Sequence, residues 1–275
     1  MNETASFAAA RTESGGALPQ ILLTGVAMCF IGHGAFGLMT KQGWVPYFGV
    51  VGITEPMALK LMPWVGTMDV AIGFLAFVWP SRALFAWAAF WATWTALLRP
   101  LAGQGWPEFF ERTGNYGVPL AILAAVGLKG SWSSRLPEHW PELTSHDRRR
   151  LIWTLRLAAA SLLAGHATCA LILQKPSLVH HYSALGIASP FSLMVAVGWF
   201  ELLLAVVVLV VKSPAVFGFV CLWKFITEAL FLTSGAMTPV FEVIERGGSY
   251  IVPLALVYLL AQSDTKITLP KLQPA

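Results

Sequence analysis

Residues Phe191–Val211 read FSLMVAVGWFELLLAVVVLVV, a run of 21 residues in which Glu201 carries the one charged side chain. An α-helix needs about 20 mainly apolar residues to cross the hydrocarbon core of a bilayer. In that core every backbone N–H and C=O group has to be paired, and an α-helix pairs them within its own segment. The run therefore predicts a membrane-spanning helix.

The rest of the 275-residue chain has the composition of a membrane protein. Apolar residues make up 56% of it and charged residues 12%, whereas soluble domains have about 45–50% and about 25%. The 18 Lys and Arg residues exceed the 14 Asp and Glu residues only slightly and are scattered, which argues against the basic face that nucleic-acid binding needs. We expect the lipid bilayer as a partner and no nucleic acid.

Apolar runs along the whole chain predict an all-α integral membrane protein with about eight transmembrane helices. The expected spans are Gln20–Thr40, Pro63–Trp79, Ala83–Leu98, Pro107–Leu128, Leu151–Leu173, Phe191–Val211, Ala215–Thr233 and Phe241–Ala261. Eight crossings place both termini on one side, where we count eleven Lys and Arg residues against six on the other. The positive-inside rule then predicts a multi-pass protein of the plasma (inner) membrane with cytoplasmic termini.

The two halves of the chain are similar to each other. Glu111–Leu123 (ERTGNYGVPLAIL) matches Glu245–Val257 (ERGGSYIVPLALV) at eight of thirteen positions. Nearly the same offset pairs Gly32-His33 with Gly165-His166, Lys41 with Lys175, Gly52-Ile53 with Gly186-Ile187, Asp69 with Glu201, Pro80 with Pro214, and Trp91 with Trp223. Such self-similarity indicates an internal repeat, here two four-helix units of the same orientation.

The repeat divides the chain into five segments. We expect a polar N-terminal tail at 1–19, a first membrane unit at 20–128, a basic cytoplasmic linker at 129–150, a second membrane unit at 151–261 and a C-terminal tail at 262–275.

Ionisable residues at membrane depth form the first candidate site: Asp69, Glu201, Lys224 and Glu228. Each costs about 2.5–3.5 kcal/mol on insertion scales, so such residues face the bundle interior and often mark function. Lys224 and Glu228 are spaced i,i+4 and share a helix face, while their first-half counterparts are Ala92 and Ala96. Two interpretations stay open, a neutralising ion pair and a proton or quinone-headgroup site.

Two histidines, His33 and His166, occupy matching positions in the first helix of each half. One interpretation is a hydrogen-bonded contact between helices. The other is joint ligation of one haem iron or copper ion, which neutral imidazole suits. His180 and His181 are expected in a loop after the fifth span, where neighbouring side chains point in different directions, and no metal site is predicted.

A second candidate group lies at the start of the last helix of each half. It consists of Glu111, Arg112, Glu245 and Arg246, and Arg99 is close enough in sequence to join it. A carboxylate complements a helix N-terminus, and Arg binds carboxylates in bidentate fashion. The group is therefore either an ion-pair latch that closes each half or an anion site at the outer mouth.

These elements together resemble the DoxX-like superfamily of small membrane proteins. The resemblance rests on a Gly-rich first helix, a loop with Lys, Trp, Tyr-Phe and Gly-Ile, an early acid in the second helix and a late Glu-Arg, Tyr and Pro-Leu element. In this chain they are Gly32–Lys41, Trp44–Ile53, Asp69 and Glu111–Leu120, then Gly165–Lys175, Tyr182–Ile187, Glu201 and Glu245–Leu254. The second copy departs from the pattern where Leu178-Val-His replaces Trp44-Val-Pro.

Family members include the small subunit of thiosulfate:quinone oxidoreductase and partners of superoxide dismutase and sulfurtransferase. The resemblance implies a redox-linked membrane subunit that binds quinone or haem b, or anchors a soluble oxidoreductase as a redox partner. The alternative is a non-enzymatic transporter of a small molecule or metal, or an assembly scaffold. The family supplies no catalytic motif, so catalytic residues stay unassigned.

Overall fold

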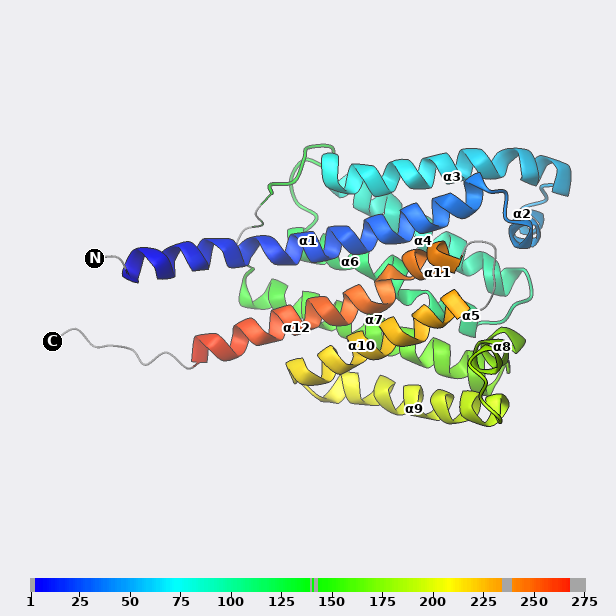
Figure 1. The fold of residues 1–275 in the computed structure, drawn as a ribbon. Coiled ribbons are helices and arrows are strands. Elements are labelled where there is room, and N and C mark those ends of the chain that lie inside the picture. Colours follow the sequence, from blue (N-terminus) through cyan, green and yellow to red (C-terminus); the bar gives the residue numbers. More distant parts are fainter. Residues whose placement is uncertain (1–2, 139, 141–142, 234–238, 268–275) are drawn as a thin grey trace.

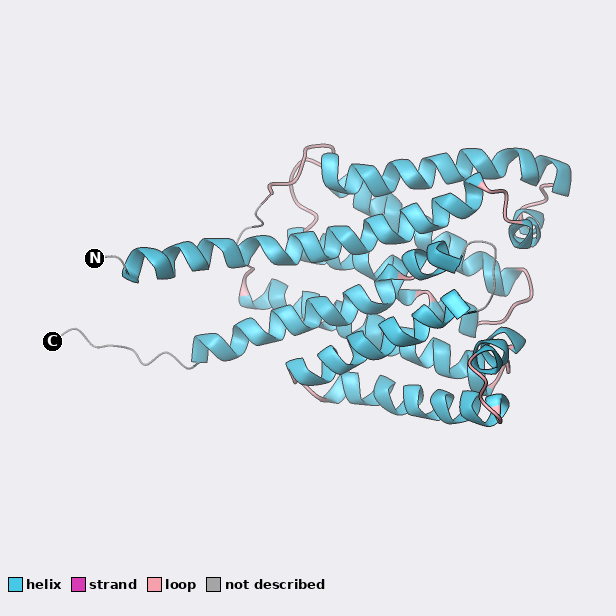
Figure 2. Ribbon diagram, in the orientation of Figure 1, coloured by secondary structure: helices cyan, strands magenta, loops and turns pink. Residues whose placement is uncertain are grey.

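The computed structural model describes residues 3–138, 140, 143–233 and 239–267, and within them the chain forms helices and loops with no strand (Figure 2). Five helical segments among these residues are long and apolar enough to cross a membrane. They are Ala17–Leu38 of α1 (Glu3–Leu38), α3 (Glu55–Val78), α7 (Ser145–Leu171), α9 (Pro190–Val210), and α10 (Pro214–Ala229) with η2 (Leu230–Thr233). The protein is a helical membrane protein.

Three further helices run beside these segments. They are α4 (Arg82–Leu101), α6 (Thr113–Val126) and α12 (Gly247–Ile267). The helix α6 and the first sixteen residues of α12 are apolar but short. In the bundle α1 packs on α3, α4 on α6, α7 on α9, and α10 on α12.

Short helices gather at one end of the bundle. The helices α2 (Val45–Val50), α5 (Pro107–Glu111) and α8 (Pro176–Ala184) lie at the end opposite to the start of α1 and the end of α12 (Figure 1). The 3-10 turn η1 (Gln42–Trp44) leads into α2, and α11 (Pro239–Glu245) precedes α12. These short elements carry several of the polar groups described below, including Glu111, His181 and Glu245.

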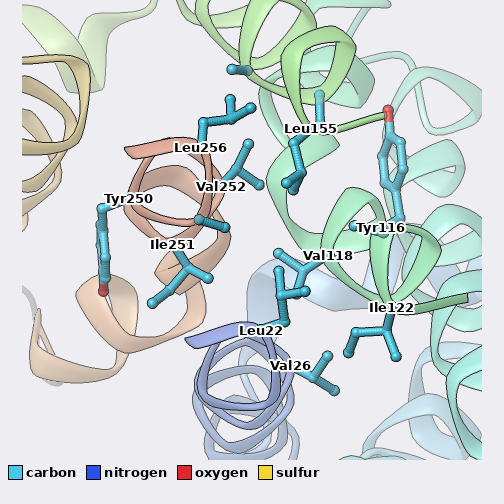
Figure 3. Close-up of a cluster of buried hydrophobic side chains, with 14 of the residues drawn as sticks. Leu22, Val26, Tyr116, Val118, Ile122, Leu155, Tyr250, Ile251, Val252 and Leu256 are labelled. Carbon is cyan, nitrogen blue, oxygen red and sulfur yellow. The ribbon is translucent and has the colours of Figure 1, made fainter. Parts of the chain in front are cut away.

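The apolar core lies where α1, α6, α7 and α12 meet, so residues from both ends of the chain share it (Figure 3). Its members include Leu22 and Val26 of α1, Val118 and Ile122 of α6, Leu155 of α7, and Val252 and Leu256 of α12. All of these side chains are buried.

Glycines let the backbones in this region approach closely. A Cβ atom on Gly114 would lie 2.6 Å from the carbonyl carbon of Gly248, so the starts of α6 and α12 cross backbone to backbone. Likewise Gly32 of α1 packs on the backbone of Glu245, and Gly165 of α7 packs on the backbone of Glu111. Small residues allow such close contact between membrane helices.

The local structure differs from the expected elements in several places. The expected spans Pro107–Leu128 and Phe241–Ala261 are each divided, into α5 and α6 and into α11 and α12, with the break at Arg112 and at Arg246. The expected N-terminal tail is helical from Glu3 onward. Of the expected C-terminal tail, 262–267 continue α12 and 268–275 lie outside the described residues.

The prediction of a loop at His180 and His181 was wrong, because both lie in α8. Pro176 occupies the first turn of α8, where its missing N–H has no intrahelical partner to lose.

Candidate functional site

A cavity of about 280 Å³ lies at the end of the bundle that carries α2, α5 and α8. It is the larger of the two cavities that we consider among the described residues. Both halves contribute to it, with polar lining residues Lys41, Tyr47, Arg99, Glu111, Arg112, His166, Lys175, His181, Glu201, Glu228, Glu242, Glu245 and Arg246. Glu201 and Glu228 of the first candidate group therefore meet the whole second group at one cavity, whereas Asp69 and Lys224 do not line it.

Arg246 links the two groups. Its Nε lies 3.0 Å from Oε2 of Glu228, its Nη1 lies 3.0 Å from Oε2 of Glu242, and its Nη2 lies 3.5 Å from Oε1 of Glu111. The guanidinium also sits over the ring of Phe231, 4.2 Å from its centroid. One arginine thus connects α5, α10 and α11.

The membrane-depth charges of the second half form a continuous series. The Nζ of Lys224 lies 3.2 Å from Oε1 of Glu201 and 3.4 Å from Oε1 of Glu228. The Nε2 of His166 lies 3.2 Å from the same Oε1 of Glu228. Lys224, Glu201 and Glu228 are all buried. Lys224 therefore neutralises carboxylates on two helices, and the series extends beyond the i,i+4 pair to the cavity wall.

The first half has a smaller polar group at the matching place. Nδ1 of His33 lies 2.7 Å from Oδ2 of Asp69, and Nε1 of Trp91 donates a hydrogen bond of 2.8 Å to Oδ1 of Asp69. In the second half Nε1 of Trp223 donates to Oε1 of Glu201 at 3.1 Å. Asp69 is fully buried. With Asp69, all four candidate residues at membrane depth point away from the protein surface.

The two histidines serve different helices and different cavities. His33 links α1 to α3 through Asp69, and its ring stacks on Trp44 at 4.3 Å. His166 links α7 to α10 through Glu228 and lines the large cavity. His33 instead lines a cavity of about 20 Å³, far smaller than a haem. The geometry favours contacts between helices over joint ligation of one iron or copper ion.

Three members of the second candidate group, Glu111, Arg112 and Arg246, belong to an ion-pair network at the cavity. Nη1 of Arg112 lies 2.8 Å from Oε2 of Glu108 and 3.0 Å from Oε2 of Glu111. Lys175 reaches the same Glu108, with 2.5 Å between Nζ and Oε1. Burial alone would lower the pKa of Lys175, but Glu111 and Glu108 outweigh burial and raise it. Arg112 pairs within the first half, whereas Lys175–Glu108 and Arg246–Glu111 join the two halves.

The ion-pair network includes a group of residues that could in principle ligate a metal ion, but the ion pairs explain it better. Carboxylate oxygens of Glu108 and Glu111 and the thiol of Cys169 lie within 4.8 Å of one another. Both carboxylates are already paired with Lys175 and Arg112. The grouping is an ion-pair cluster with a neighbouring thiol.

Several buried donors at the cavity have no hydrogen-bond partner within the protein. They are Nε of Arg99, Nε of Arg112 and both ring nitrogens of His181. Leaving such a group unpaired costs about 1–3 kcal/mol, so unpaired buried polar atoms point to a bound water or ligand.

His181 is the residue of this set that sequence reasoning missed. It is 4% exposed and packs edge-on against Phe231, at 4.7 Å between ring centroids. Burial, Arg246 and His180 lower its pKa below the ordinary 6.5. The imidazole is therefore neutral at pH 7 and offers one donor and one acceptor to the cavity. The sequence feature that could have identified His181 is its alignment with Tyr47, 134 positions earlier in the first half.

The charges of the whole network nearly balance. The cations are Lys41, Arg99, Arg112, Lys175, Lys224 and Arg246, and the carboxylates are Asp69, Glu108, Glu111, Glu201, Glu228, Glu242 and Glu245. Six positive charges thus stand against seven negative ones, the histidines not counted.

Comparison with protein-family models, with curated proteins and with solved structures found no match for this chain. The description of the site therefore rests on its own geometry.

Proposed function

We propose that this chain is a redox-linked membrane subunit whose cavity binds the headgroup of a quinone. The observation that carries the proposal is the 280 Å³ cavity lined by Arg112 and His181, both of which have buried nitrogen atoms without a hydrogen-bond partner. Its volume is close to the lower limit of about 300 Å³ for small-molecule sites, which suits a single ring.

The chemistry of the lining fits both redox states of such a ring. A quinone presents carbonyl oxygens, which accept hydrogen bonds from Nε of Arg112 and from the N–H of His181. A quinol presents hydroxyl groups, for which Glu228 and the second ring nitrogen of His181 are acceptors. Both carboxylate oxygens of Glu228 are buried, and they form ion pairs with Arg246, His166 and Lys224. Aromatic side chains of Trp44, Tyr47 and Phe231 add apolar walls.

Quinone reduction consumes electrons and protons together. The buried series Glu201, Lys224, Glu228 and His166 supplies ionisable groups beside the ring. The electrons would come from a soluble or membrane-bound oxidoreductase, which is the partner that the DoxX-like resemblance implies. The proposal includes that this chain anchors that partner at the membrane.

We further propose that the chain is a tandem repeat of two DoxX-like four-helix units with eight crossings. Paired contacts support it. Trp91 with Asp69 and Trp223 with Glu201 are each 22 positions apart and form the same type of bond. The hydroxyl of Tyr116 donates to the carbonyl of Phe109, and that of Tyr250 to the carbonyl of Val243, seven positions back in both cases.

The same proposal places the protein in the plasma membrane with cytoplasmic termini. The support for this orientation is the distribution of Lys and Arg along the sequence. The cavity would then open on the non-cytoplasmic side, at the end of the bundle opposite to the start of α1 (Figure 1).

The binding proposal is tested with purified protein in nanodiscs and a short-chain ubiquinone. Solvent extracts of the purified protein should contain quinone, and the probe should quench tryptophan fluorescence because Trp44 lines the cavity. His181→Leu should weaken binding about tenfold, since one hydrogen bond is worth about 0.5–1.5 kcal/mol and about 1.4 kcal/mol is tenfold.

The matched control is His180→Leu on the same helix, because His180 is exposed and does not line the cavity. It should bind like the wild type. A protein that holds no quinone and binds no probe would overturn the proposal and favour the transporter or scaffold class.

A further inference from the structure

Arg99 differs from the other cations that line the large cavity in the partners of its charge. Lys41, Arg112, Lys175 and Arg246 line the cavity too, and each has a nitrogen within 3.0 Å of a carboxylate oxygen. Arg99 lines the same cavity, but it takes part in none of the ion pairs formed by the described residues.

The contacts of Arg99 are made with a tyrosine. Nη1 of Arg99 donates a hydrogen bond of 2.7 Å to the hydroxyl of Tyr47, and its guanidinium lies 5.1 Å from the centroid of the Tyr47 ring. The Tyr47 hydroxyl donates in turn to Oε1 of Gln104 at 2.9 Å. These contacts hold the guanidinium in place, but they bring no negative charge to it.

The chemistry of Arg99 at the cavity is therefore incomplete within the described part of the chain. Its Nε is buried and has no hydrogen-bond partner in the protein, as is also true of Nε of Arg112. The charge of Arg112 is already balanced by Glu108 and Glu111, whereas that of Arg99 is not. Buried charges in proteins are normally paired, so Arg99 is the cation whose pairing is left to a ligand.

The second half has no charge at the matching position. Under the proposed repeat the counterpart of Arg99 is Phe231, 132 positions later. A four-helix unit is thus built with an aromatic side chain at this position, and the shared fold does not account for the charge of Arg99. A role in binding does.

We infer that Arg99 binds an acidic group of the ligand, and that the cavity takes a quinone ring that bears an ionised hydroxyl group. The planar guanidinium of Arg presents donors in a fork that suits an oxyanion, and hydrogen bonds between charged groups are the stronger ones. The carbonyl oxygens of the ring keep the partners already described, Arg112 and His181. The acidic group rests on the unpaired charge of Arg99, whereas the quinone ring rests on the proposed function.

The test compares two probes that share a ring and differ in charge. Lawsone, a hydroxynaphthoquinone, is ionised at pH 7, and its methyl ether is uncharged. Purified protein in nanodiscs of phosphatidylcholine is dialysed to equilibrium with each probe, and empty nanodiscs correct for partition into lipid. Wild-type protein should bind lawsone about tenfold more tightly than the ether, because a hydrogen bond to a charged group is worth more than a neutral one.

Variants assign this preference to Arg99. Arg99→Met should bind the two probes with similar affinity, and Arg99→Lys should keep part of the preference; Arg99→Gln replaces Arg99→Met if that variant does not fold. The matched control is Lys60→Met, because Lys60 is exposed on α3 and does not line the cavity. It removes one positive charge and should keep the full preference.

Equal affinity of wild-type protein for the two probes would overturn the inference and leave the quinone proposal standing. The same holds for an undiminished preference in a monodisperse Arg99→Met or Arg99→Gln variant.

A second pair of probes, naphthoate and naphthamide, differs in charge and has no quinone carbonyls. Binding of naphthoate but not of naphthamide, lost in Arg99→Met, together with no binding of either quinone, would sink the quinone proposal and leave the acidic-group site standing. No binding of any of the four probes would overturn both.

Discussion

Lys41 and Glu242 are 201 positions apart in the sequence, yet Nζ of the first lies 2.6 Å from Oε1 of the second. The counterpart pair is Lys175 and Glu108, and it joins the two halves in the opposite sense. Each half therefore extends a lysine to a glutamate in the short helix, α5 or α11, that precedes the other half's last helix. These two ion pairs connect the two halves at the cavity, which Lys41, Lys175 and Glu242 line.

The two pairs differ in burial, and we expect their loss to differ accordingly. The side chain of Lys41 is 36% exposed and that of Glu242 is 16% exposed, against 25% and 7% for Lys175 and Glu108. Lys41→Met should cost about 1 kcal/mol of stability, the upper end for exposed pairs. Lys175→Met should cost about 3 kcal/mol, the lower end for breaking a buried pair. Denaturant unfolding in detergent measures both, and equal losses would contradict the assignment.

Glu201→Gln should leave membrane insertion intact and reduce quinone affinity. A glutamine oxygen still accepts the hydrogen bond from Trp223, but Lys224 keeps only Glu228 as a carboxylate partner. Lys224 should then pair more closely with Glu228, so that the Glu228 carboxylate is less available to a ligand in the cavity. Expression level, detergent elution profile and probe titration check this, and unchanged affinity would assign Glu201 a purely structural role.

The protein should lose stability as the pH falls below about 6.5, with a contribution from His181. Its pKa in the folded protein is lowered by burial, by Arg246 and by His180. Between that value and the ordinary 6.5 the unfolded chain binds the proton and the folded chain does not, so stability falls with falling pH. In thermal unfolding, the wild-type curve should be steeper than that of His181→Leu as the pH falls through and below 6.5, and parallel curves would refute the role of His181.

Gly114→Ala should destabilise the protein by about 1–3 kcal/mol, the usual cost of overpacking. The added methyl group would lie 2.6 Å from the carbonyl carbon of Gly248, and backbone cannot yield as a flexible side chain does. Gly49→Ala is the matched control, because a Cβ atom there meets nothing within 4 Å. Thermal unfolding of both variants gives the comparison, and similar melting temperatures would contradict the close crossing of α6 and α12.

The helical membrane architecture could be predicted because lipid imposes it on long apolar runs. The burial of Asp69, Glu201 and Lys224 followed from the same cost of charge in lipid. The breaks at Arg112 and Arg246 fall in the polar runs Glu111–Asn115 and Glu245–Ser249. They were not predicted, because a polar run can continue an apolar helix as well as end it. The role of His181 in the cavity was not predicted for a different reason. Its importance depends on which partners it lacks in the folded chain, and no local pattern reports that.

The reciprocal packing of Gly32 on Glu245 and of Gly165 on Glu111 has an evolutionary consequence. If the halves arose by duplication, the ancestral unit would have paired with an identical copy through these same crossings. Two identical chains have to mutate in step, so neither member of such a dimer could hold Lys224 or Phe231 while the other held Ala92 or Arg99. Under the proposed duplication, gene fusion would have released that constraint, so that one unit could specialise while the other became its support.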